Sequence, residues 1–419
     1  MSTKGSATSA AETRLSPGAV QFASDNNSAI CPEAWRALER ANAGHAPAYG
    51  ADDWTAAARD AISGLFETAC DVYFVYTGTA ANSLALAAMC RSTDAIVCHA
   101  QAHINVDECG GPEFMSGGAK LLPIDAPDAK LTPDAVVAAA VTPHDEHSSR
   151  PRALSLTQAT ELGTVYSAAE IAALCDAAHA RRMKVQMDGA RFANAVAALG
   201  CKPADITWRA GVDVLCLGGT KNGLPAGEAI VFFDRALADE FARRRKQAGQ
   251  LASKMRYLAA PWLGALEDSA WLRHAAHANA MARRLAGALE SIPEARLLAP
   301  VQANGVFVDL PRSVIESLHG AGWHFYAFVG ETGVRLMCAW DTPVEAVDRF
   351  VADLRGALAK PAARSRSLRQ PFSADRPGRL RREHVRNRRQ QRWRFVPSSR
   401  WKRRTSAAPA ACRACSVSA

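Results

Sequence analysis

The sequence has no long hydrophobic run. Nowhere in its 419 residues do the roughly 18 to 20 uninterrupted apolar residues of a membrane span occur. The first twenty residues, MSTKGSATSAAETRLSPGAV, also lack the apolar core of a secretory signal. These absences argue against a membrane protein, and we expect a cytoplasmic one.

Paired cysteine motifs are also scarce. The 11 cysteines are scattered, and most lie inside apolar stretches such as Val214-Leu215-Cys216. Small buried thiols are therefore expected in place of disulfides. The one CxxC, from Cys412 to Cys415, has no second ligand pair, so no metal is expected there.

Basic charge is concentrated at one end of the chain. Residues 361–419 hold 17 Lys and Arg against 2 Asp and Glu, a net charge of +15. The whole chain carries +9, which leaves −6 on residues 1–360. The positive charge thus belongs to a tail and not to a folded binding face.

Apolar runs of strand length alternate with Ala-rich helical stretches from Phe22 to about Lys360, which predicts βαβ units around a mostly parallel sheet. Continuous apolar strands imply helices on both faces. Residues 167–182 begin with Ser167 and Glu170 at capping-box spacing, and we predict a helix there. The expected strands are 72–76, 95–100, 153–158, 184–188, 212–218 and 229–233.

The pattern changes after residue 233. A long helical region is expected over 236–262 and a further helix over 269–292, followed by a smaller unit. That unit has strand-like runs at 304–310 and 333–340 and helix-like runs at 313–322 and 342–360. The expected parts are a disordered segment 1–21, a large cofactor-binding domain 22–262, a small C-terminal α/β domain 263–360, and a basic, disordered tail 361–419.

Two predicted strands end in residues that suit chemistry. The strand 184–188 ends in Asp188 and continues Gly-Ala-Arg191, at the sheet edge where α/β proteins bind ligands. The next strand runs into Thr220-Lys221-Asn222-Gly223. Partial burial of Lys221 would lower the pKa of its amine, as imine formation with an aldehyde requires. A capping Asp and a solvent-exposed turn Lys are the structural alternatives.

A third feature lies upstream, in the segment Thr77-Gly78-Thr79-Ala80-Ala81-Asn82 between a strand and a helix. Its backbone N–H groups and hydroxyls would surround a phosphate at the helix N-terminus. The missing Gly-Lys-Ser/Thr and GxGxxG patterns favour a monophosphate over a nucleotide. A Thr-rich cap without ligand is the alternative.

Together the three features describe one pyridoxal-phosphate (PLP) site. An Asp pairs with the pyridine nitrogen, a Lys forms the Schiff base, and a helix N-terminus takes the phosphate. Their joint occurrence in this order is far more specific than any one of them.

Beyond these three features, the chain as a whole resembles the threonine aldolases of the β-eliminating lyase family, which are PLP enzymes of the aspartate-aminotransferase-like fold (fold type I). The resemblance runs from about residue 22 to 360. Its low-specificity or phenylserine-type branch is indicated by QATELGTVY (158–166) and GGTKNG (218–223). The other matching motifs are FASDN (22–26), PAYG (47–50), TGTAAN (77–82), AHINVDE (102–108), MDGARF (187–192), SKMRY (253–257) and GVRLMCAWDT (333–342).

The resemblance implies residue roles. Lys221 would be the Schiff-base lysine, Asp188 the pyridinium partner and His103 the ring-stacking histidine. Phosphate ligands would be Gly78 and Thr79. Arg335 would be the arginine that binds the substrate carboxylate, helped by Ser24 and by Arg191, which also borders the cofactor. Arg256 would be a phosphate arginine supplied by a neighbouring subunit, and Tyr49 would lie near the site.

The same resemblance implies a homo-oligomer, a dimer with shared sites or a tetramer. It also implies cleavage of L-threonine, L-allo-threonine or phenylserine-like β-hydroxy-α-amino acids into glycine and an aldehyde. Around Gln158-Ala159-Thr160 the chain departs from relatives that carry a second histidine, so a base at that position does not transfer. His103 is the candidate base, or positions a water that acts as one.

Two other functions remain open. The same Lys and Asp would also serve β-elimination or transamination, because function depends on the site and not on the fold. The tail, with Trp393 and Trp401 among arginines, could form a nucleic-acid arm, although the acidic body offers no continuing basic face.

Overall fold

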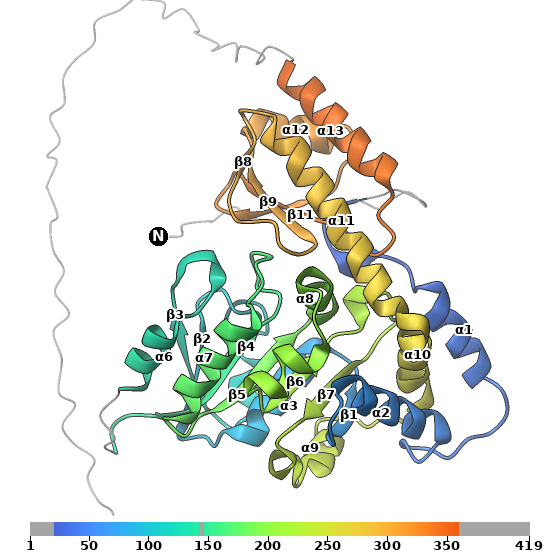
Figure 1. Ribbon diagram of the computed structural model, residues 1–419, viewed down its shortest axis with the longest axis vertical. Coiled ribbons are helices and arrows are strands. Elements are labelled where there is room, and N and C mark those ends of the chain that lie inside the picture. The colour runs from blue at the N-terminus through green and yellow to red at the C-terminus, as the bar shows by residue number, and fades with distance from the viewer. Residues whose placement is uncertain (1–20, 142–145, 360–419) are drawn as a thin grey trace, which may run out of the picture. The chain divides into compact units, whose positions relative to one another are not determined.

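The computed structural model describes residues 21–141 and 146–359. The predicted basic tail lies outside these ranges, and so does the predicted disordered segment 1–21 apart from its last residue. A large sheet holds the strands in the order β1-β7-β6-β5-β4-β2-β3 (Figure 1). They are β1 (Asp71–Val75), β2 (Asp94–His99), β3 (Lys120–Ile124), β4 (Arg150–Thr157), β5 (Lys184–Gly189), β6 (Val214–Leu217) and β7 (Glu228–Phe232).

The neighbours from β3 to β6 pair in parallel, whereas β7 runs antiparallel to both β6 and β1. The predicted mostly parallel sheet is confirmed, and β3 is a strand that the sequence did not predict. The described helices are α1 (Pro32–Ala41), α2 (Asp53–Phe66), α3 (Gly78–Met89), α4 (His103–Val106), α5 (Gly111–Met115), α6 (Pro133–Ala140), α7 (Ala168–His179), α8 (Phe192–Leu199), α9 (Phe241–Gln247), α10 (Arg256–Leu266), α11 (Ala270–Glu290), α12 (Arg312–Gly320) and α13 (Val344–Ala359).

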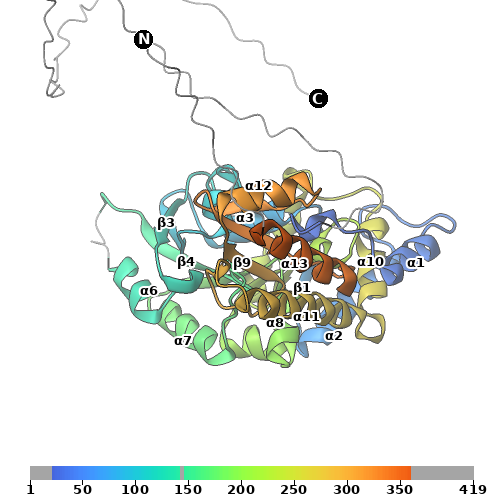
Figure 2. The same cartoon turned by 90° about the horizontal axis from the view of Figure 1, so that it is seen from above.

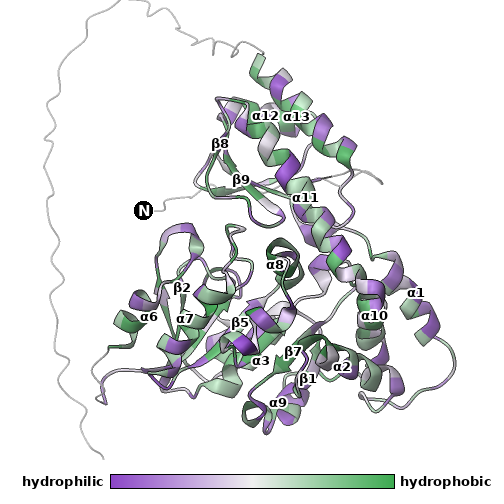
Figure 3. Ribbon diagram, in the orientation of Figure 1, coloured by the Kyte–Doolittle hydropathy of each residue, from purple (hydrophilic) through white to green (hydrophobic). Residues whose placement is uncertain are grey.

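Helices cover the large sheet on both faces, as the apolar strands predicted. One core packs α2, α7, α8 and α10 against side chains such as Leu154, Val185 and Leu215. The opposite core places α3 against Val214 and Ile230. In Figure 3 the helices carry both hydrophobic and hydrophilic residues along their length, as expected where one face of a helix packs on a sheet.

Local sequence explains two helix starts that matter for the site. The Ser167 side chain accepts from the Glu170 N–H, and the Glu170 carboxylate accepts from Ser167, so the predicted capping box of α7 is present. At α3, the Thr77 hydroxyl accepts a hydrogen bond from the Ala80 N–H. Helix α3 therefore begins at the C-terminal end of β1 with its N-terminus at the edge of the sheet.

The prediction of a long helical region over 236–262 is wrong. A short 3₁₀ helix, η6 (Arg235–Ala238), then α9 and α10 occupy this stretch, with residues 248–255 outside any helix. Gly249 adopts φ +73°, in the left-handed region that ends helices. The continuous Ala-rich composition concealed this break.

A second sheet of four antiparallel strands, in the order β10-β11-β9-β8, follows in the chain. Its core packs α11, α12 and α13, which lie together in Figure 2, against β9 and β11. The predicted strands and helices of this unit are present, and β8 and β10 were not predicted. The strands are β8 (Arg296–Leu297), β9 (Gly305–Asp309), β10 (Tyr326–Val329) and β11 (Gly333–Met337).

The N-terminal segment joins this second core. Phe22 is fully buried there and stacks on Trp323 with ring centroids 5.6 Å apart. The predicted domain boundary between residues 262 and 263 falls inside α10, and all described residues belong to one compact unit. Two structural domains with that boundary stay a prediction.

The described cysteines fit the expectation of buried thiols. Nine are free, and six of these are buried. None of the described helices is long and apolar enough to cross a membrane.

Candidate active site

A cavity of about 280 Å³ opens at the C-terminal ends of the parallel strands. A smaller one of about 60 Å³ adjoins it, sharing the lining residues Gly78, Asn82, His103, Asp188, Ala190 and Lys221. Six of the residues predicted from sequence thus meet at one place: Lys221, Asp188, His103, Gly78, Thr79 and Arg191, of which Thr79 lines only the larger cavity and Arg191 only the smaller one.

Asp188 lies at the end of β5, and only 5% of the residue is exposed. Its Oδ2 accepts from Asn82 Nδ2 at 2.9 Å, and its Oδ1 accepts from the Ala190 N–H at 3.0 Å. Asn82 is in turn held by Gln186 and Glu108. The carboxylate is therefore fixed in a buried network, which suits a group that pairs with one defined cation.

Lys221 sits on the short 3₁₀ helix η5 (Thr220–Asn222), directly after β6. Asn222 donates to the Trp271 carbonyl of α11 at 2.8 Å, and Cys31 N–H donates to the Gly223 carbonyl at 2.8 Å, so the turn is tied on both sides. Burial, and then the positive charge of Arg191, lowers the pKa of the Lys221 amine. This direction agrees with the lowered amine pKa that the sequence predicted for Lys221.

The two strands that carry Asp188 and Lys221 approach each other closely at their ends. A Cβ on Gly218 would lie 2.6 Å from the Ala190 carbonyl oxygen, and one on Gly189 would lie 2.8 Å from the Cys216 carbonyl oxygen. Glycine at both positions lets the backbones pass at this distance.

The N-terminus of α3 faces the cavity. Thr77, Gly78 and Thr79 line it, and the N–H groups of Gly78 and Thr79 donate to no acceptor in the described part of the chain. A Cβ on Gly78 would meet nothing within 4 Å. Free N–H groups, nearby hydroxyls and open space at a helix N-terminus fit a phosphate.

His103 begins α4 and lines both cavities. Its Nδ1 lies 2.8 Å from Glu108 Oε1, and this hydrogen bond raises the pKa of the imidazole. Its backbone N–H donates to Glu161 Oε1 at 2.9 Å. The ring is thereby oriented by one carboxylate and its backbone by another.

Glu161 is a cavity residue that sequence reasoning missed. It lines the smaller cavity beside Lys221 and Asp188. Burial, and then the negative charge of Asp188, raises the pKa of its carboxyl to about 7. It lies inside the quoted motif QATELGTVY, yet nothing in its spacing signals that its side chain turns into the site.

Arg191 forms a buried ion pair that was not predicted. Its Nε and Nη2 donate to the two carboxylate oxygens of Asp25 at 2.7 and 2.9 Å, and Asn304 donates to the same carboxylate at 3.1 Å. Burial alone would raise the pKa of Asp25, but the charge and hydrogen bonds of Arg191, the charge of Lys221 and the hydrogen bond from Asn304 together outweigh it, and the pKa is lowered. Arg191 still lines the smaller cavity.

Arg335 and Ser24 lie near this pair and outside both cavity linings. Arg335 Nη2 donates to the Ala23 carbonyl at 3.1 Å, its guanidinium covers the Phe328 ring at 5.0 Å, and its buried Nε has no partner among the described residues. The Ser24 hydroxyl accepts from the Asn26 N–H. Arg335 thus retains a hydrogen-bond donor for a further acceptor.

Tyr49 and Arg256 do not line the cavity of their own chain. Tyr49 is 52% exposed, and its N–H donates to the Ser253 carbonyl, which places its loop against the segment that leads to Arg256. Arg256 donates to the Gly44 carbonyl at 3.2 Å. The two residues therefore occupy one neighbouring surface region.

The donor set fits pyridoxal phosphate. It offers a phosphate cap, a fixed carboxylate for a ring nitrogen and a lysine of lowered pKa in one cavity. Fold and site together define a PLP-dependent enzyme of fold type I.

Comparisons with known proteins narrow this class. The model of the family "Beta-eliminating lyase" matches residues 21–312, and the chain belongs to that family. It is 53% identical to a low specificity L-threonine aldolase of a Pseudomonas species, over 81% of this chain and 98% of the relative. It is also 55% identical to a low specificity L-threonine aldolase of Pseudomonas aeruginosa, over 80% of this chain and 97% of the relative.

Solved structures agree with this placement. A threonine aldolase of Leishmania major superposes with a TM-score of 0.77 at 28% identity, covering 81% of this chain and all of that one. A serine palmitoyltransferase of Sphingomonas wittichii, at 14% identity and a TM-score of 0.62, shares the fold. The predicted family, fold class and cofactor are confirmed.

Proposed function

We propose that the chain is a low-specificity L-threonine aldolase, which cleaves L-threonine and related β-hydroxy-α-amino acids into glycine and an aldehyde. The observation that carries the proposal is the meeting of Lys221, Asp188 and the α3 N-terminus in one cavity, within a chain more than half identical to two low specificity L-threonine aldolases. L-allo-threonine and phenylserine-like substrates belong to the same proposal.

Pyridoxal phosphate, when bound, supplies an aldehyde that captures amino groups covalently and a ring that accepts the electron pair of a broken bond. Lys221 would hold the aldehyde carbon through its amine. Asp188 Oδ2 would keep a proton on the ring nitrogen, and the N–H groups of Gly78 and Thr79 would bind the phosphate. His103 would pack on the ring.

The substrate carboxylate is assigned to the arginine pair. Arg335 has an unpartnered Nε, and Arg191 lines the smaller cavity with its charge balanced by Asp25. Burial, and then the positive charge of Arg191, lowers the pKa of Arg335, so an anion between the two guanidinium groups would stabilise both. The Ser24 hydroxyl would help. Fixing the carboxylate orients the bond that breaks.

A neighbouring copy would complete the site. Three apolar side chains at the cavity or on neighbouring helices are exposed. Tyr76 lines the larger cavity and is 43% exposed; Val106, on the same helix as His103, is 61% exposed; and Phe114, on α5, is 81% exposed. Covering them in a homo-oligomer, a dimer or tetramer, would bring Tyr49 and Arg256 of one copy to the cavity of another.

Mixing Lys221→Ala with Arg256→Ala protein should then restore activity that neither variant has alone. A mixture as inactive as its two components would contradict shared sites.

The reaction is tested by product analysis. Purified protein with PLP should release glycine and aldehyde in equal amounts from L-threonine, L-allo-threonine and L-phenylserine. Formation of a keto acid without glycine would transfer the function to β-elimination or transamination on the same fold. The cytoplasmic location stays a prediction from the sequence.

A further inference from the structure

One carboxylate of the cavity, that of Glu161, is assigned neither to the cofactor nor to the substrate carboxylate. Glu161 follows β4 and lines the smaller cavity together with Lys221, Asp188 and His103. Among the described residues, its Oε1 accepts from the His103 N–H at 2.9 Å and from the Thr157 hydroxyl at 2.9 Å, whereas its buried Oε2 has no partner. One oxygen is anchored and the other is available.

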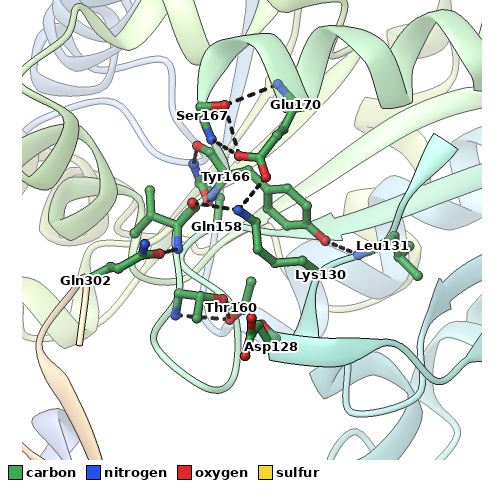
Figure 4. A network of polar contacts seen from close by, with 11 residues as sticks. Asp128, Lys130, Leu131, Gln158, Thr160, Tyr166, Ser167, Glu170 and Gln302 are labelled. Atoms are coloured by element: carbon green, nitrogen blue, oxygen red, sulfur yellow. Dashed lines mark hydrogen bonds and ion pairs between the residues drawn. The ribbon is translucent and has the colours of Figure 1, made fainter. Parts of the chain in front are cut away.

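The segment that carries Glu161 is held firmly on both sides. Gln158 donates to the Tyr166 carbonyl at 2.8 Å and accepts from the Tyr166 N–H at 3.0 Å, which closes the loop on itself (Figure 4). Gln302 accepts from the Val165 N–H at 2.7 Å, and the Thr160 and Thr164 hydroxyls lie 2.7 Å apart. A carboxylate on such a loop is pre-positioned, as a proton-transferring group must be.

The surroundings of Glu161 suit proton transfer near neutral pH. The charged groups around it are Asp188 on β5, His103 on α4, and Arg191 and Lys221 at the cavity wall. With a pKa of about 7, the carboxyl can both accept and return a proton under working conditions.

His103 is less suited to accept a proton. Its Nδ1 is engaged by Glu108 at 2.8 Å, and the raised pKa of the imidazole keeps it protonated over more of the neutral range. An imidazolium has no free lone pair for a substrate hydroxyl. This leaves Glu161 as the better acceptor in the cavity.

We propose that Glu161 Oε2 is the base that takes the β-hydroxyl proton of the substrate. The inference rests on the proposed aldol cleavage. The O–H bond breaks as the proton moves to Oε2, the oxygen forms the aldehyde C=O, and the Cα–Cβ bond breaks. The bound cofactor would supply the sink for the electron pair of that bond; protonation at Cα then gives glycine, and no net proton is consumed.

The test uses the holoenzyme of Glu161→Gln. Glutamine retains an oxygen for the His103 N–H and the Thr157 hydroxyl but cannot accept the proton. We expect kcat for L-threonine cleavage to fall by about 10²- to 10⁴-fold with little change in KM, and the acidic limb of the kcat profile near pH 7 to disappear. Glu161→Asp should recover part of the loss.

Glu113→Gln is the matched control, because Glu113 also has a buried, unpartnered carboxylate oxygen but lies outside both cavity linings. It should retain wild-type kcat. Activity of Glu161→Gln within about threefold of wild type would overturn the proposal.

Two further readouts separate a base from a structural residue. Glycine lacks the β-hydroxyl, so Glu161→Gln should still bind glycine, seen as a change of cofactor absorbance, and should still exchange its α-hydrogen in D₂O at the wild-type rate. Parallel loss of exchange and cleavage would assign Glu161 a structural role and overturn the proposal. If wild type exchanges glycine but cleaves none of the β-hydroxy substrates, the proposed function fails instead.

Discussion

Asp25→Asn removes the negative partner of a buried cation, and burial of that cation sets the size of the effect. The Asp25 side chain is 1% exposed and that of Arg191 is 16% exposed, and two hydrogen bonds of 2.7 and 2.9 Å join them. Removing one partner of such a pair strands the other charge away from water, at a cost of about 3–5 kcal/mol. We expect this loss in the free energy of unfolding.

The same geometry occurs on the surface and supplies the control. Arg284 donates to both oxygens of Asp348 at 2.7 and 2.8 Å, with the two side chains 49% and 53% exposed. Asp348→Asn should leave the free energy of unfolding nearly unchanged, because both groups stay hydrated. Burial, not hydrogen-bond length, is therefore the variable that the two variants compare.

Urea unfolding at fixed, saturating PLP measures both variants, with thermal melts as a second probe. At roughly 2 °C per kcal/mol for a chain of this size, Asp25→Asn should lower Tm by about 6–10 °C. KM for L-threonine should also rise, because Arg191 loses the partner that orients it. Equal effects of the two substitutions would show that burial does not set the strength of the ion pair.

Substitutions of the lysine, the ring partner and the strand ends, and exposure to acid, should each have a distinct effect on the protein. Lys221→Ala should abolish turnover, and aldolase activity retained in that variant would remove Lys221 from its assigned role. Asp188→Asn should cripple catalysis while cofactor absorbance shows that PLP still binds; near-normal kcat would contradict the pairing with the ring nitrogen. Gly218→Ala should destabilise the protein in a thermal melt and weaken PLP binding, because the new Cβ would lie 2.6 Å from the Ala190 carbonyl oxygen, and an unchanged melt would show that the strand ends can separate. The pKa of Asp25 is lowered in the folded protein, so its ion pair stabilises the fold fully above the ordinary pKa of 3.8. This contribution is lost as the pH falls through the lowered pKa, and the acid-unfolding curve of Asp25→Asn should therefore lack it.

The sequence predicted those parts of the site that depend on local pattern. Asp188 lies at the end of β5, whereas Lys221 and Thr77 follow β6 and β1; strands that run in the same direction bring their C-terminal ends to one edge, so chain order alone placed these residues together. The capping box of α7 is likewise a local pattern. The break at Gly249 also had a local signal, which the surrounding helix-forming residues outweighed.

The sequence could not reveal pairings between distant segments. Asp25 and Arg191 are 166 residues apart, and no periodicity links them. Glu161 resembles any loop glutamate until the fold buries it beside Asp188. Strand β10 was missed because its four residues are exposed and carry no alternation of buried and exposed positions. The roles of Tyr49 and Arg256 depend on a second copy and stay predictions.

Borohydride reduction tests the assignment of Lys221 as the cofactor lysine, since it fixes PLP covalently to the lysine that holds it. Digestion and mass spectrometry of the reduced protein should find the label on the peptide containing Lys221, with one label per chain, and should find none after L-threonine has been added in excess to displace the lysine. A label on any other lysine, or an unlabelled chain after reduction with PLP, would contradict the assignment of this cavity as the catalytic site.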